Sequence, residues 1–151
     1  MAGRPRVEPQ RERLLALPLA LPGALLTHPF GDVVNVYKVG VQAASDTGGR
    51  HSGGKMFCLV SLDGDPGSMT LKVDPDHGVE LVREHEAISP GYHTNKRHWI
   101  TVVLDGSVDD ALVRELIEDS YDLVVSTLTA RIRVDIDPDR FPLPASGAPR
   151  T

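Results

Sequence analysis

The residues best suited to chemistry lie together in the stretch from Pro90 to Trp99. It contains Lys96, Arg97, two histidines, Tyr92 and the chain's only tryptophan, and it contains no carboxylate. Arginine offers paired N–H donors that match a phosphate or carboxylate, and lysine adds a compact positive charge. A β-prone run follows, so these groups are expected on a turn at the mouth of a strand. The stretch therefore predicts an anion-binding surface.

Lysines from predicted strands are expected to extend this surface. The full set of predicted nucleic-acid or anion-binding residues is Lys38, Lys55, Lys72, Tyr92, His93, Asn95, Lys96, Arg97, His98 and Trp99. Each has a structural alternative. The cations could be a solvated strand end, the histidines could be hydrogen-bonded structural groups rather than proton carriers, and the two rings could be core rather than stacking platforms. The histidines have no carboxylate nearby in sequence, which favours the structural alternative for them.

Composition excludes several classes of function. The 151 residues suit one domain, and the net charge of −5 means that any anion site must be a local patch. Cys58 is the single cysteine and the six histidines are scattered, so neither a disulfide framework nor a metal site is expected, and no cofactor is implied.

Met56 follows Gly54-Lys55 where a phosphate-binding loop needs Ser or Thr. No nucleophile motif is present, so an enzyme is the less favoured alternative.

No apolar run approaches the ~18 residues of a membrane span. The Leu-rich start is cut by Pro18 and Pro22, which argues against a secretory signal. A cytoplasmic protein without a membrane partner is therefore expected.

The elements that must position these residues can be read from local signals. A helix is expected over 9–17, broken by Pro18. Asp74-Pro75 is typical of a helix start, and Ser107 with Asp110 resembles a capping box before an amphipathic helix with an acidic outer face. Strands are predicted over 33–39, 55–62, 69–73 and 99–104.

This order predicts an α+β fold, a two-layer sandwich with a mainly antiparallel sheet and helices on one face. Residues 1–8 are expected to be a flexible leader, 9–128 the domain, and 41–53 a polar loop insertion within it. Residues 129–151 are expected to be a disordered tail, in which 131–136 alternates and could add an edge strand.

Several short motifs resemble one family. They are His28-Pro29-Phe30-Gly31, Val36-Tyr37-Lys38-Val39, Gly54-Lys55-Met56-Phe57, Pro90-Gly91-Tyr92-His93, Asn95-Lys96-Arg97-His98-Trp99, Asp105-Gly106-Ser107 and Asp119-Ser120-Tyr121. In this order they are similar to the MmcQ/YjbR family. The resemblance implies a CyaY-like fold and a DNA-binding role, which the family is assigned on structural analogy. The insertion at 41–53, Thr94 and Pro18 depart from the family pattern.

The resemblance makes double-stranded DNA, or another phosphate-bearing ligand, the expected partner. Two other classes stay open. The chain could be a protein-interaction module that uses the acidic helix and the open sheet face, or a small-ligand protein or enzyme with His93 or His98 as acid and base.

Overall fold

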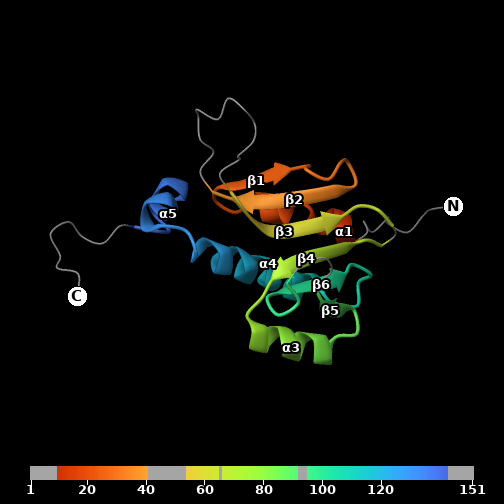
Figure 1. Cartoon of the computed structure of the whole chain (residues 1–151). Coiled ribbons are helices and arrows are strands. Elements are labelled where there is room, and N and C mark those ends of the chain that lie inside the picture. Colours follow the sequence, from red (N-terminus) through yellow and green to blue (C-terminus); the bar gives the residue numbers. More distant parts are fainter. Residues whose placement is uncertain (1–9, 41–53, 65, 92–94, 143–151) are drawn as a thin grey trace, which may run out of the picture.

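The structure of the protein is a computed structural model that describes residues 10–40, 54–64, 66–91 and 95–142. Its strands form one antiparallel sheet in the order β1-β2-β3-β4-β6-β5 (Figure 1). The strands are β1 Ala24–Thr27, β2 Val34–Val39, β3 Lys55–Ser61, β4 Ser68–Lys72, β5 Ile88–Pro90 and β6 Trp99–Val103. The predicted α+β class with an antiparallel sheet is confirmed.

Strand register separates a core face from an open face. Tyr37, Cys58, Leu71 and Ile100 are successive partners across β2, β3, β4 and β6, and all four are buried. The next row, Val36, Leu59, Thr70 and Thr101, points to the opposite, open face because side chains alternate along a strand. In the middle of this face Val36, Thr70 and Thr101 are nevertheless buried. Thr70 and Thr101 share a hydrogen bond of 3.0 Å there.

The helices cover the core face. The longest is α4 Asp110–Val125, which lies against the sheet (Figure 1) and contacts β2, β3 and β4. It buries the apolar stripe that the sequence predicts. Helix α3 Pro75–Glu84 contacts β5 and β6, and the short helices α1 Gln10–Leu14 and α2 Ala16–Leu19 contact α4. None of the described helices has the length and apolar character needed to cross a membrane.

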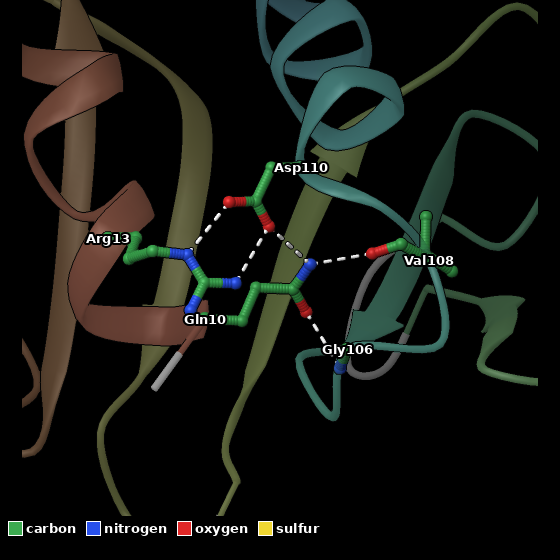
Figure 2. Close-up of polar contacts among 5 residues, drawn as sticks. All are labelled: Gln10, Arg13, Gly106, Val108 and Asp110. Atoms are coloured by element: carbon green, nitrogen blue, oxygen red, sulfur yellow. Dashed lines mark hydrogen bonds and ion pairs between the residues drawn. The ribbon is translucent and has the colours of Figure 1, made fainter. Parts of the chain in front are cut away.

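Polar contacts tie the first helix to the loop before α4 (Figure 2). The Gln10 amide donates to the carbonyl of Val108 at 2.6 Å and to Asp110 at 3.0 Å, and its oxygen accepts from the N–H of Gly106 at 3.0 Å. Arg13 makes a forked ion pair with Asp110. These hydrogen bonds from Arg13 and Gln10 lower the pKa of Asp110 to about 2.

The helix caps confirm one sequence prediction and correct another. Asp74 caps α3 by accepting from Asp76 N, with Pro75 at the first helical position. The cap of α4 is Asp109, which accepts from Leu112 N. Ser107 instead bonds to Asp105 inside the preceding turn, because that turn brings its hydroxyl to the Asp105 carboxylate at 2.6 Å.

Three features differ from the sequence predictions. The helix expected over 9–17 with a break at Pro18 is two short helices, α1 and α2, which are separated at Leu15, and Pro18 lies inside α2. Strand β1 was not predicted, since it is short and lies at the sheet edge. Residues 131–136 do not form an edge strand, because Ala130–Ile136 is helix α5, capped by Thr129. Ile132, Ile136 and Phe141 pack against the core, so the described part of the predicted tail belongs to the domain. The leader at 1–8, the insertion at 41–53 and residues 143–151 lie outside the described residues.

Candidate anion-binding surface

The sheet brings several basic residues to one of its ends. Lys38 near the end of β2 pairs with Met56 at the start of β3. Lys72 at the end of β4 pairs with Trp99 at the start of β6. Because antiparallel neighbours place the end of one strand beside the start of the next, these positions lie at the same end of the sheet as the turn that precedes Trp99.

Asn95 shapes this turn. Its side-chain oxygen accepts from the N–H of Arg97 at 3.0 Å, and its carbonyl accepts from the N–H of His98 at 3.1 Å. The His98 carbonyl then accepts from Val73 N at 2.8 Å, which anchors the turn to the end of β4. Asn is typical of such turns because its short amide bonds the backbone two residues on. All four residues from Asn95 to His98 are exposed.

Neither Lys96 nor Arg97 forms an ion pair with a carboxylate among the described residues. The ion pairs among the described residues use Arg11, Arg13, Arg131 and Arg140. The Lys96 ammonium donates to the Gly91 carbonyl at 3.3 Å, which leaves further N–H donors of the same group. Within the described part of the chain, the Arg97 guanidinium has no hydrogen bond or ion pair. The turn can therefore offer both charges to an outside anion.

The other predicted residues are less uniformly placed. Lys55 donates to Thr127 at 3.0 Å, just beyond α4, so it is directed to the helix side of the sheet. Lys38 is half-buried on the open face and Trp99 is half-buried beside Lys72. The His98 ring is exposed and forms no hydrogen bond within the described residues. Tyr92 and His93 lie outside the described residues.

Acidic residues limit the positive surface on its helix side. A hollow of about 240 Å³ between α3 and α4 is lined by Lys72 and His77 together with Asp74, Asp119 and Asp122. Burial raises the pKa of Asp119, and the neighbouring Glu115 adds to this shift. The described residues contain no group of three or more His, Cys, Asp or Glu arranged to hold a metal ion. Lys72 therefore lies among carboxylates, whereas Lys96 and Arg97 are not part of the lining of this hollow.

Other motif residues prove to be structural. Ser120 on α4 donates to the Phe57 carbonyl at 2.5 Å and accepts from Lys72 N at 2.8 Å, so one hydroxyl bridges β3 and β4. The Tyr121 hydroxyl donates to the Pro22 carbonyl at 2.5 Å, and its ring meets Phe57 edge to face. Their position in the buried helix stripe gave no sign of these bonds, which depend on strands distant in sequence.

The fold and the exposed turn define a small α+β protein with one sheet and with a basic turn at one end of that sheet. A sequence profile of the YjbR family matches residues 19–123, and the chain belongs to that family. It is 38% identical over 123 residues to the uncharacterised protein YbdF of Escherichia coli O157:H7, covering 81% of this chain and 89% of that protein. It is 34% identical over 73 residues to the uncharacterised protein YjbR of Escherichia coli K12, covering 48% and 62%.

Solved structures agree with the fold. The crystal structure of protein DR2400 from Deinococcus radiodurans has a TM-score of 0.74 and 36% sequence identity, covering 95% of this chain and 99% of that one. A crystal structure of a Pseudomonas syringae protein has a TM-score of 0.57 and 27% identity, covering 76% and 97%. The family resemblance noted from the motifs is thus confirmed.

Proposed function

We propose that this protein contacts the phosphate backbone of double-stranded DNA through the turn at Lys96 and Arg97. The observation that supports this function is the exposed pair of cations, adjacent in sequence and outside every ion pair of the described residues. Lys72 at the neighbouring strand end is a further cation, although it lines the same hollow as Asp74, Asp119 and Asp122. Phosphate contacts of this kind provide affinity without reading sequence.

The expected affinity is weak and strongly dependent on salt. If Lys72, Lys96 and Arg97 each neutralise one phosphate, log affinity falls with log salt at a slope of about −3, from roughly −0.9 per contact. The net charge of −5 opposes long-range attraction, so binding depends on the local pair. No catalysis and no cofactor are required. Since the relatives are bacterial, a DNA-binding role implies a cytoplasmic protein.

A titration of a labelled duplex at several salt concentrations tests the proposal. The double variant Lys96→Ala/Arg97→Ala is expected to flatten the slope by about two contacts and to leave the unfolding midpoint unchanged, because exposed charges add little stability. The matched control is Arg83→Ala/Arg114→Ala, which removes the same charge from exposed positions on α3 and α4. No binding at low salt, or equal slopes for the two double variants, would refute the proposal. That result would leave the exposed acidic face of α4 as the better candidate, for a protein partner.

A further inference from the structure

A second feature adjoins the basic turn. A groove of about 320 Å³ lies between the first turns of α3 and the strands β5 and β6. Its apolar lining consists of Val73, Pro75, Val79, Val82, Pro90 and Ile100. Val79 is 59% exposed, so no described part of the chain covers it, whereas Val73 and Ile100 deeper in the groove are only 4% and 2% exposed.

Close packing of α3 forms the floor of the groove. At Gly78 a Cβ atom would come within 2.9 Å of Val73 Cγ1 and 3.7 Å of Ile100 Cγ2. Glycine therefore lets the helix backbone approach the strands, and Val79 and Val82 follow it along the groove wall. The floor is formed by α3, by Ile100 of β6 and by Val73, which lies in the connection between β4 and α3.

Few charged residues line the groove, and the basic ones outnumber the acidic one. Asp76, Lys96 and Arg97 are its ionisable lining residues, so the lining carries a net charge of about +1 at neutral pH. Asp76 forms no ion pair with either cation among the described residues. An apolar surface with a small number of polar groups at one side is typical of a small-molecule site, and the volume falls at the lower end of the usual range of ~300–1,000 Å³.

We propose that this groove binds a small organic carboxylate. The apolar body of the ligand lies against Val79, Val82 and Pro90, and its carboxylate accepts from the Arg97 guanidinium and the Lys96 ammonium. A single negative charge matches the net charge of the lining, whereas a phosphate dianion would leave excess negative charge beside Asp76. Contact with a DNA backbone would use only the cations Lys96 and Arg97. Binding of a carboxylate would use these cations and also the apolar wall of the groove, which the proposed function does not need.

A matched pair of probes separates charge from shape. We would titrate the protein with 2-naphthoate and with its neutral analogue 2-naphthamide, and follow backbone amide signals by ¹⁵N NMR. Naphthoate is expected to shift the signals of Gly78, Val79 and Ile100 and to bind about tenfold more tightly than naphthamide, since a charge-assisted hydrogen bond is roughly twice as strong as a neutral one. Equal affinities for the two probes, or shifts that avoid these residues, would overturn the proposal.

Two variants with matched controls test the assigned contacts. Arg97→Gln is expected to weaken naphthoate binding by about fivefold to tenfold and to leave naphthamide unaffected, whereas Arg83→Gln, an exposed arginine outside the groove, changes neither. Val79→Asn is expected to weaken both probes by about fivefold, whereas Val33→Asn, another exposed valine, weakens neither. All four proteins should keep the wild-type unfolding midpoint, because the substituted side chains are exposed.

The same variants separate this proposal from DNA binding. Val79→Asn should leave the salt slope for duplex binding unchanged, while Lys96→Ala/Arg97→Ala should reduce both activities. If duplex binding is absent and naphthoate still binds with the expected variant pattern, the ligand site stands alone. If Val79→Asn and Val33→Asn have the same effect on naphthoate, the groove is not the site.

Discussion

The N-terminal contact through Gln10 provides the strongest test of how this domain is held together. Gln10 is only 4% exposed, and its amide makes three hydrogen bonds that join α1 to the segment before α4 (Figure 2). The substitution Gln10→Leu keeps a side chain of similar length and removes all three bonds. It leaves the carbonyl of Val108, a residue 1% exposed, without this partner.

The expected loss of folding free energy depends on which former hydrogen-bond partners of Gln10 water can reach. A buried carbonyl without a partner costs about 1–3 kcal/mol, and each of the bonds to Gly106 and Asp110, which belong to exposed or half-buried residues, contributes about 0.5 kcal/mol. The buried leucine returns part of this loss through apolar contact. A net destabilisation of about 2–3 kcal/mol is expected, which corresponds to a fall in the unfolding temperature of about 5–10 °C for a chain of this size.

Urea and thermal unfolding of the wild type, Gln10→Leu and Arg13→Gln measure this cost. Arg13 belongs to the same cluster, but its ion pair with Asp110 is more exposed, with side-chain accessibilities of 35% and 43%. Such a pair is worth about 1 kcal/mol or less. The buried amide should therefore outweigh the ion pair by at least twofold. If Arg13→Gln destabilises the protein as much as Gln10→Leu, the reasoning from burial is wrong.

Three further predictions concern other contacts. Ser120→Ala removes the hydroxyl that bridges Phe57 and Lys72 and should lower the free energy of unfolding by about 2–3 kcal/mol in urea denaturation. A loss below about 0.5 kcal/mol would mean that water replaces the bridge. The pKa of Asp110 is lowered from 3.8 to about 2, so its contribution is present above pH 4 and is lost as the pH falls toward 2. The stability difference between wild type and Asp110→Asn should therefore shrink between pH 5 and pH 2, and a constant difference would contradict the assignment. Burial raises the pKa of the Cys58 thiol, so a disulfide reagent should modify it only as fast as the protein opens, and rapid modification of native protein would show that Cys58 is accessible.

Short sequence patterns predicted the elements whose structure depends on interactions between residues close together in the chain. The start of α3 depends on Asp74 and Pro75, which act on the residues that immediately follow them. The stripe of α4 predicts its buried side because one helix repeats its faces over a few residues. The turn at Asn95 and its adjacent cations could also be recognised, since a side chain that bonds the backbone two residues on requires no distant partner.

Elements decided by distant contacts were missed or misread. The sequence of α5 alternates like a strand, but the packing of Ile136 beside Gly23 and of Ile132 against the core belongs to a helix. Strand β1 has few residues, and its pairing with β2 is what makes it a strand. Tertiary context decided both cases because neither segment has a strong preference of its own.

By itself, the sequence determined the α+β class, the family and the exposed basic turn, because periodic apolar residues, caps and turn residues act over short distances. Only the tertiary structure decided that Lys55 is held by Thr127, that Ser120 bridges two strands, and that Lys96 and Arg97 border an apolar groove against α3. These arrangements join segments far apart in the chain, and the sheet order that brings them together is set by packing of the whole core.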